Sequence, residues 1–369
     1  MNDITSSPRT RAAPSAWRLG EEPKSADARN IDSTAASAAA LDLLLAAVHF
    51  DDESCASRAS VLHQLRANEL DRLPLPGSGK TATRWRALTA VAACDLSLAK
   101  LYESHTDALA ILAELHRADL SYDGTWAVWA AEPPNARVVA RALHGDHLIL
   151  DGVKAWCSGA SRVTHALLTA WFDDQPVLAA VELSQPNITV DASGWQAVGM
   201  RATGTANVRF DGARATQIGD VGAYVERPGF WHGGAGIAAC WLGGLAAIAT
   251  TLVEAVARHA EPHASAHLGA VDAELSSAAA LLRETASLID AHPRADARRP
   301  ALRARVAVDR AAARVIEHVS RALGPAPFCT DAKFARALAD LPVFLRQSHA
   351  ERDEEVLAQA LLQEHASHL

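Results

Sequence analysis

The feature that most constrains this fold is a change, made twice along the chain, in the spacing of apolar residues. From about 33 to 120 they recur at helical spacing. From about 122 to 218 they form short β-rich runs separated by Asp-Gly, Gly-Asp and Asp-Asp pairs, as in antiparallel hairpins. From about 230 helical stripes return. We therefore predict an α+β fold, mainly α, with a disordered N-terminal segment at 1–30, an N-terminal helical domain at 31–121, a middle β domain at 122–220 and a C-terminal helical bundle at 221–369.

The composition favours a globular protein that binds neither nucleic acid nor membranes. The net charge of the 369 residues is −8, whereas phosphate binding needs concentrated positive charge. The uncharged segment 236–253 is long enough to cross a bilayer, but Gly and Ala dominate it, so we expect a buried helix. An odd number of widely spaced cysteines and the lack of an apolar leader in the first 30 residues favour a cytoplasmic protein with reduced thiols.

Two glycine-containing stretches resemble nucleotide-binding motifs without matching them. "PLPGSGKTATR", residues 74–84, has Pro74 where a phosphate-binding loop needs its first glycine, and helical segments flank it on both sides. We predict an ordinary loop. "GFWHGGAGIAACW", residues 229–241, lacks the GxGxxG spacing, and we expect its glycines to let the following helix pack closely.

Three histidines lie four residues apart, at His259, His263 and His267. On one helix they would form a column of metal ligands, but Pro262 interrupts that helix and no acidic partner accompanies them. We predict a polar helix end and no metal site.

Two stretches of the β region carry side chains suited to a flat ligand. "LDGVKAWCSGAS", residues 150–161, reads as a strand whose alternation would place Lys154, Trp156 and Ser158 on one face. Trp156 could stack on a heteroaromatic ring and Ser158 could hydrogen-bond it, although a core tryptophan is the simpler interpretation. "WQAVGMRATGTANVRFDG", residues 195–212, indicates a tight loop before a strand.

These pieces, in this order, resemble the acyl-CoA dehydrogenase superfamily of flavoproteins. The similarity is carried by "AVWAAEPPN", "LDGVKAWCSGA", "GMRATGTANVRFDG" and the C-terminal "DLPVFLRQSHAERD". It implies an α domain, a β domain and a four-helix bundle, with FAD held between the β domain and the bundle of a homodimer or homotetramer. It also implies that Trp156 and Ser158 lie at the flavin ring, and that the loop carrying Arg201 and Thr203 borders the site.

The chain departs from the family pattern at several cofactor positions. Ala131 stands where a threonine usually bonds the flavin. The family's Arg-x-x-Phe-Gly corresponds to "SAHLG", with Ser265 near the arginine position, and its Gln-x-x-Gly-Gly-x-Gly corresponds at best to "RALGPAP", residues 321–327. In the family the Arg-x-x-Phe-Gly segment reaches the cofactor of a neighbouring subunit, and the loss of such positions favours a degenerate relative.

The catalytic glutamate of the family is also missing. Alignment from Asp340 places it at Ser348, or at Gln347 with a shift of one, and the alternative position in the first bundle helix falls near Ile237. His349 and Glu351 are close enough in sequence to act as the base instead. Equally, the acidic residues from Glu351 onward form a solvated first turn of the last helix, an arrangement that the helix dipole favours.

Three functions follow from the resemblance. The first is FAD-dependent oxidation of an acyl thioester or another small activated molecule, by α-proton removal and hydride transfer to the flavin, with His349 or Glu351 as base and an electron acceptor left open. The second is a flavin-dependent monooxygenase on the same scaffold, which does not need the glutamate. The third is a degenerate, non-catalytic relative that acts as a partner subunit.

Overall fold

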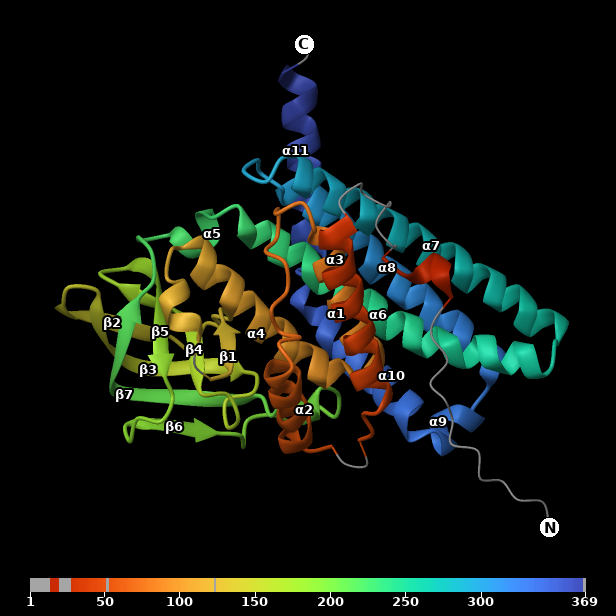
Figure 1. The fold of residues 1–369 in the computed structure, drawn as a ribbon, viewed down its shortest axis with the longest axis horizontal. Coiled ribbons are helices and arrows are strands. Elements are labelled where there is room, and N and C mark those ends of the chain that lie inside the picture. The colour runs from red at the N-terminus through yellow and green to blue at the C-terminus, as the bar shows by residue number, and fades with distance from the viewer. Residues whose placement is uncertain (1–13, 20–27, 51–52, 123, 368–369) are drawn as a thin grey trace.

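The structure, a computed structural model, describes residues 14–19, 28–50, 53–122 and 124–367. Figure 1 shows helices at both ends of the chain packed together on one side and a β domain on the other. The chain passes from helices to strands between Tyr122 and Trp126, and back between Gln217 and Ala223. The predicted α+β organisation, mainly α, is confirmed.

The N-terminal helical region consists of four α-helices and two short 3-10 helices in the described residues. They are η1 (Ser15–Trp17), α1 (Ala28–Ala46), α2 (Cys55–Ala67), α3 (Thr81–Cys94), α4 (Leu96–Glu114) and η2 (Ala118–Tyr122). Much of the segment 1–30 that we predicted to be disordered lies outside the described residues. Within it, the indole of Trp17 is buried and donates a hydrogen bond of 2.8 Å to Asp272, so this side chain packs on the C-terminal helices.

The β domain is a sheet that closes on itself. Its strands are β1 (Trp126–Trp129), β2 (Val138–His144), β3 (His147–Cys157), β4 (His165–Phe172), β5 (Gln175–Glu182), β6 (Ile188–Asp191) and β7 (Ala206–Gln217). They pair in the order β1-β4-β2-β3-β7-β5, and β5 also pairs with β4. Because β4 is bonded to β1, β2 and β5, the domain leaves few open strand edges. Its interior is a separate apolar core.

The C-terminal region is a bundle built on three long helices. They and the shorter elements around them are α5 (Ala223–Glu226), α6 (Gly229–Arg258), α7 (Pro262–Ala291), α8 (Arg298–Leu323), α9 (Ala326–Thr330), α10 (Ala332–Phe344), η4 (Leu345–Gln347) and α11 (Glu351–Ser367). An apolar stripe from Leu275 to Ile289 is buried on α7, and a second stripe from Val308 to Val319 is buried on α8. α10 packs on α6 as the fourth member, as the predicted four-helix bundle requires.

α6 is the central helix of the molecule. It is the one described helix long and apolar enough to cross a membrane, but 72% of its apolar window is buried inside the protein, as predicted for the segment 236–253. Its glycines allow close packing: a Cβ on Gly243 would lie 2.3 Å from the carbonyl oxygen of Thr89 on α3. A single apolar core joins the N-terminal helices to the bundle through α6.

The stretch that resembles a phosphate-binding loop has its amide groups satisfied within the chain. The backbone N–H groups of Gly79 and Thr81 donate to the carboxylate of Asp290 over 3.0 and 2.9 Å, and the hydroxyl of Thr81 donates over 2.6 Å. An intramolecular carboxylate therefore occupies the place that an anion would take, in keeping with the prediction of an ordinary loop.

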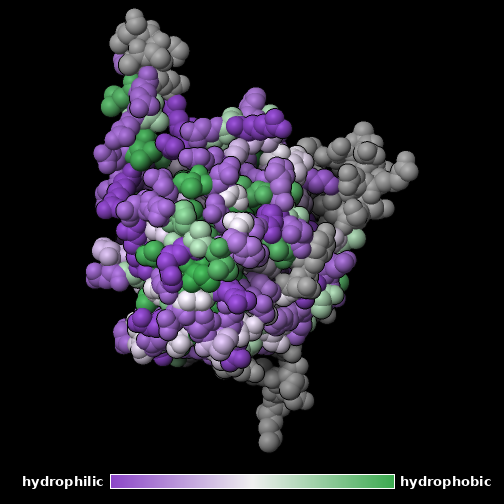
Figure 2. All heavy atoms as spheres, turned by 90° about the vertical axis from the view of Figure 1, so that its left-hand side faces the viewer, coloured by the Kyte–Doolittle hydropathy of each residue, from purple (hydrophilic) through white to green (hydrophobic). Residues whose placement is uncertain are grey.

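Figure 2 looks onto the β domain from outside and shows a mostly hydrophilic face with a central group of hydrophobic side chains. Exposed apolar side chains on this part of the chain include Val139, Leu143, Val221 and Val225. α11 extends beyond the body of the molecule in both views and carries the exposed pair Leu361 and Leu362.

Candidate functional site

The end of β3 carries an exposed tryptophan on irregular backbone. Trp156 has a left-handed φ of +57°, and the pairing with β7 shifts register between Lys154 and Cys157. Lys154 is buried, whereas Trp156 is 59% exposed. The predicted strict alternation of Lys154 and Trp156 therefore fails, because the backbone irregularity turns the tryptophan outward on its own.

Lys154 has a structural environment inside the β domain. Its ammonium group donates to Glu132 over 3.1 Å and to the carbonyl oxygen of Thr169 over 2.8 Å. Burial lowers the pKa of Lys154, and the negative charge of Glu132 opposes that effect. These bonds hold β3 and β4 to the segment after β1, directly below the strand end that presents Trp156.

Hydroxyl groups connect the strand end to the loop before β7. The Ser158 hydroxyl lies 3.0 Å from that of Thr205, which lies 2.7 Å from that of Thr203. Thr203 donates onward to the carbonyl oxygen of Met200 over 2.6 Å. The structure thus brings together Ser158 and Thr203, which the sequence placed in two separate motifs.

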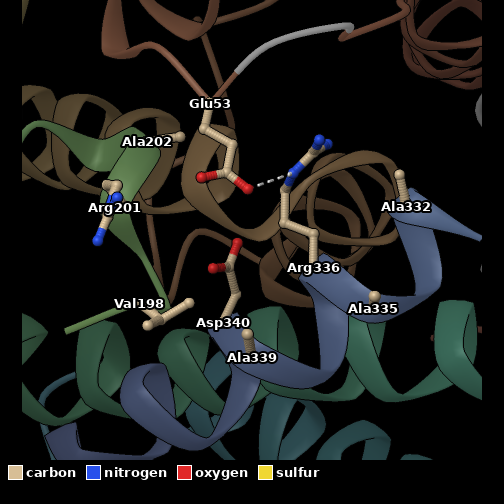
Figure 3. A pocket seen from close by; sticks show the side chains of 9 residues that line it. All are labelled: Glu53, Val198, Arg201, Ala202, Ala332, Ala335, Arg336, Ala339 and Asp340. Atoms are coloured by element: carbon tan, nitrogen blue, oxygen red, sulfur yellow. Dashed lines mark ion pairs between the residues drawn. The ribbon is translucent and has the colours of Figure 1, made fainter. Parts of the chain in front are cut away.

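Arg201 lies on the rim of a pocket of about 280 Å³ between this loop and α10 (Figure 3). Its lining residues are Glu53, Val198, Arg201, Ala202, Ala332, Ala335, Arg336, Ala339 and Asp340. Small alanine side chains of α10 form one wall. Arg336 reaches toward Glu53, with the two charged groups 3.9 Å apart.

Asp340 is the buried acid at the base of this pocket. It accepts the Met200 N–H over 2.5 Å and lies 3.4 Å from the Ser97 hydroxyl. Burial raises its pKa to about 6, against 3.8 for a solvated aspartate, and the negative charge of Asp95 adds to that shift. Asp340 therefore ties α10 to the loop that carries Arg201, at the cost of a poorly solvated charge.

We expect Asp340→Asn to remove one pH dependence of stability. Between pH 4 and about 6 the folded chain binds the Asp340 proton more tightly than the unfolded chain, so the free energy of unfolding of the wild type falls as the pH rises through this window. The loss is on the order of 1–3 kcal/mol. Urea denaturation of both proteins from pH 4 to 8 should show that the free energy of unfolding of the variant rises relative to that of the wild type. If the two free energies change with pH in parallel, the raised pKa of Asp340 is contradicted.

The two predicted catalytic residues lie on the outside of the molecule. His349 has a side chain that is 70% exposed and lies 3.5 Å from Asp353. Glu351 is exposed at the first residue of α11. Ser348, at the aligned position of the family's glutamate, is buried. The segment thus presents no carboxylate at that position. Glu351 lies instead in a solvent-exposed first turn of the last helix, the alternative to a catalytic role.

The buried acid of the same segment is already engaged. Asp353 accepts the backbone N–H of His349 over 3.1 Å and lies 4.0 Å from the guanidinium of Arg305. Arg305 also donates to the carbonyl oxygens of Gly234 over 2.8 Å and Gln347 over 2.6 Å. This network fixes the turn before α11 against α6 and α8.

Sequence reasoning missed two acidic residues on the side of α4 that faces α6. Glu103 is buried, pairs with Lys100 over 2.8 Å, and has its pKa raised by burial. Asp107 is half-buried, and its carboxylate faces Gly233, where an added Cβ would lie 2.9 Å from Oδ1. The available signal was the helical spacing of three charged residues, Lys100, Glu103 and Asp107, in an otherwise apolar segment. Charged residues on a buried helix face are rare unless they are paired or functional.

A metal centre finds no support in the described part of the chain, where no three His, Cys, Asp or Glu side chains gather closely enough to hold an ion. The three spaced histidines do not share one helix: His259 follows the end of α6 at Arg258, whereas His263 and His267 lie on α7, which begins at Pro262. His267 instead lies 2.8 Å from His318 of α8.

No known family model and no curated protein sequence matches this chain. Solved structures do match in three dimensions. KijD3 in complex with FMN and dTDP-3-amino-2,3,6-trideoxy-4-keto-3-methyl-D-glucose is 21% identical, with 96% of this chain and 97% of that chain covered and a TM-score of 0.74. Glutaryl-CoA dehydrogenase from Mycobacterium smegmatis in complex with FADH2 is 15% identical, with 93% and 95% covered and a TM-score of 0.74.

TdsC from Paenibacillus sp. A11-2 in complex with FMN and indole is 16% identical, with 92% and 98% covered and a TM-score of 0.73. At these identities the likenesses show the fold. The chain has the acyl-CoA dehydrogenase fold over nearly its whole length, as the sequence resemblance predicted.

Proposed function

We propose that the protein is a flavin-dependent monooxygenase on the acyl-CoA dehydrogenase fold. A bound flavin, reduced by an external donor, supplies the chemistry that places one atom of dioxygen on a substrate and releases the other as water. The observation that carries the proposal is the short segment between η4 and α11. Removal of an α-proton from an acyl thioester needs a base within hydrogen-bond reach, and the position aligned with the family's base is the buried Ser348.

The residues around Trp156 fit a flavin ring. Large side chains are rarely exposed on strained backbone without a function, and Trp156 combines 59% exposure with a left-handed φ. Its indole would stack on the ring, while the hydroxyl network of Ser158, Thr205 and Thr203 offers hydrogen bonds at the ring edge. Arg201, on the rim of the adjacent pocket, would attract an anionic part of the cofactor.

FMN is the form of the cofactor that we propose to test first, although the sequence resemblance predicted FAD. Two segments of the family pattern, one of which reaches the cofactor of a neighbouring subunit, are altered here at Ser265 and at residues 321–327. Two of the similar structures, KijD3 and TdsC, contain FMN. The predicted homodimer or homotetramer and the cytoplasmic location remain proposals.

Oxidation of an acyl thioester is the second candidate, because α4 does carry carboxylates. Glu103 and Asp107 lie on the side facing α6, where the family's alternative base position falls near Ile237. If one of them were the base, a thioester substrate would reduce the flavin directly, without an external donor. In that case His349 and Glu351, both at the surface, would have no catalytic role.

The test begins with flavin retention. The purified protein is incubated with FMN or FAD and passed through gel filtration, and its visible absorbance spectrum is recorded. The loaded protein is then mixed without oxygen with a panel of acyl-CoAs. Retained flavin that acyl-CoAs do not bleach, but that reoxidises in air after chemical reduction, would support the monooxygenase. Bleaching by an acyl-CoA would establish the second candidate. A protein that retains neither flavin would be a non-catalytic relative, the third hypothesis.

A further inference from the structure

Arg336, in the wall of the pocket between residues 198–202 and α10, is mostly buried and poorly paired (Figure 3). Its side chain is 17% exposed, its Nε atom is fully buried, and none of its N–H groups has a hydrogen-bond acceptor among the described residues. Its ion pair with Glu53 is loose, at 3.9 Å. A guanidinium group carries five N–H donors, and a group buried to this extent normally has acceptors for them.

Arg201 lies across the same pocket from Arg336 (Figure 3). Its side chain is exposed and forms neither a hydrogen bond nor an ion pair within the part of the chain that the structure describes. The backbone next to it is fixed against α10, since a Cβ on Gly199 would lie 2.0 Å from the carbonyl oxygen of Ala339. Two poorly paired guanidinium groups therefore line one cavity.

The two acids of the pocket compensate these arginines only in part. Asp340 is buried, and its oxygens are already engaged by the N–H of Met200 over 2.5 Å and the hydroxyl of Ser97 over 3.4 Å. Burial raises the pKa of Asp340 to about 6, so its charge is lost as the pH falls through that value. Glu53 is 55% exposed, so water can solvate its charge. The groups of the pocket that still need partners are therefore the cationic donors.

We propose that Arg201 and Arg336 bind an oxyanion, the carboxylate or phosphate group of a small molecule, in this pocket. Guanidinium groups bind such anions through pairs of charge-assisted hydrogen bonds. The apolar part of the molecule would lie against the wall of α10, where the alanines at 332, 335 and 339 offer no polar side chain. A volume of about 280 Å³ suits one small molecule.

Two sources have this chemistry: a free organic acid, and the phosphate of FMN. The site goes beyond the proposed function, because binding of a free acid requires no flavin.

Other classes of ligand fit this pocket less well. An amine would face two guanidinium groups of like charge at close range. A wholly apolar molecule would exclude water from Arg336 and leave its buried donors without acceptors, which costs more than the apolar contact returns. A neutral amide could accept hydrogen bonds from Arg336, but without the ionic part of the interaction, so its affinity should be lower than that of an anion of the same shape.

The test uses three probes of similar shape that differ in charge: benzoate, benzamide and benzylamine. Their binding to the full-length protein is measured by ligand-observed NMR titration, with and without FMN. We expect benzoate to bind at least about tenfold more tightly than benzamide, and Arg336→Met or Arg201→Met to abolish that preference, as for the loss of a charge-assisted hydrogen bond. Arg310→Met removes the same charge from an exposed position and should leave the affinities unchanged. Equal binding of the three probes, a preference for benzylamine or unchanged benzoate binding in Arg336→Met would overturn the inference.

Two further variants should change binding in the opposite direction, which damage to the fold would not do. Glu53→Gln removes the carboxylate that competes for Arg336, and Asp340→Asn removes a like charge, so each should bind benzoate several-fold more tightly at pH 7.5. Weaker benzoate binding in both variants would overturn the inference.

The affinity for benzoate should also depend on pH. It should rise several-fold from pH 7.5 to 5.5 in the wild type and in Glu53→Gln, because Asp340 gains a proton in this interval and no longer repels the anion. Asp340→Asn should show no such rise, and an equal rise in that variant would overturn the placement of the anion beside Asp340. The charged groups around Asp340 are Asp95 of α4 with its partner Arg58 of α2, Arg336 of α10, and Glu53 and Arg201 of the pocket.

The flavin forms distinguish the two sources of the anion. If the anion is the phosphate of FMN, then FMN should bind more tightly than riboflavin, Arg336→Met should remove the difference, and FMN should displace benzoate. If it is a free acid, benzoate should bind equally with and without FMN. Either result supports the oxyanion site. Benzoate binding that depends on Arg336 in a protein that retains no flavin would refute the proposed function and preserve the binding site.

Discussion

Replacement of Arg305 by Met is expected to cost about 3–5 kcal/mol of folding free energy. Arg305 is buried, and its guanidinium is the cationic partner of the buried Asp353 as well as the donor to Gly234 and Gln347. Methionine fills a similar volume but leaves a buried carboxylate and two carbonyl oxygens without these contacts. Urea denaturation of the variant should show a midpoint well below that of the wild type.

A second substitution, at Asp353, distinguishes the effect of the unpaired charge from the effect of changed packing. If the uncompensated carboxylate causes the loss, then Asp353→Asn in the Arg305→Met background should recover about 1–2 kcal/mol, because a neutral amide is cheaper to bury than a charge. Arg310→Met on the same helix is the control: its ion pair with Glu354 is mostly exposed, and its loss should cost less than about 0.5 kcal/mol. Equal effects at positions 305 and 310 would refute a buried network at the turn before α11.

The order of helices and strands was predictable because it depends on periodicity, which one sequence displays directly. The stripes of α7 and α8, the core character of α6 and the ordinary loop at 74–84 all follow from which residues are apolar and where glycine and proline interrupt them. Closure of the β domain was not predictable in this way. It depends on β2 pairing with β4 and on β7 pairing with both β3 and β5, and pairing partners far apart in sequence leave no periodic signal.

The site was harder to predict than the fold, since its chemistry depends on contacts between segments. Alternation suggested a common face for Lys154 and Trp156, but the backbone at Trp156 leaves the strand conformation, which a sequence pattern cannot show. Glu351 and Asp353 looked alike in sequence, yet Asp353 is buried only because Arg305 approaches it from another helix. Asp107 attracts notice only once Gly233 is known to face it.

The unusual backbone at Trp156 gives the sharpest test of the cofactor proposal. The left-handed backbone conformation of a non-glycine residue costs about 1 kcal/mol or more of conformational free energy. An exposed indole offsets little of this cost, because it makes few packing contacts. If the side chain is kept for the flavin, then stability and binding should respond to substitution in opposite directions. Glycine and alanine at this position remove the same ring, but only glycine relieves the backbone.

We expect Trp156→Gly and Trp156→Ala to weaken FMN binding equally, by about 5- to 150-fold, because stacking of a heteroaromatic ring on an aromatic side chain contributes about 1–3 kcal/mol. Trp156→Gly should nevertheless unfold at a higher urea concentration than Trp156→Ala, by about 1 kcal/mol. Trp156→Phe should retain part of the affinity, and Leu143→Ala, an exposed apolar change on β2, should leave it unaltered. Fluorescence titration of FMN with each variant measures the affinities. Unchanged affinity in the alanine and glycine variants would remove Trp156 from the flavin site and require the ring to bind elsewhere on the fold.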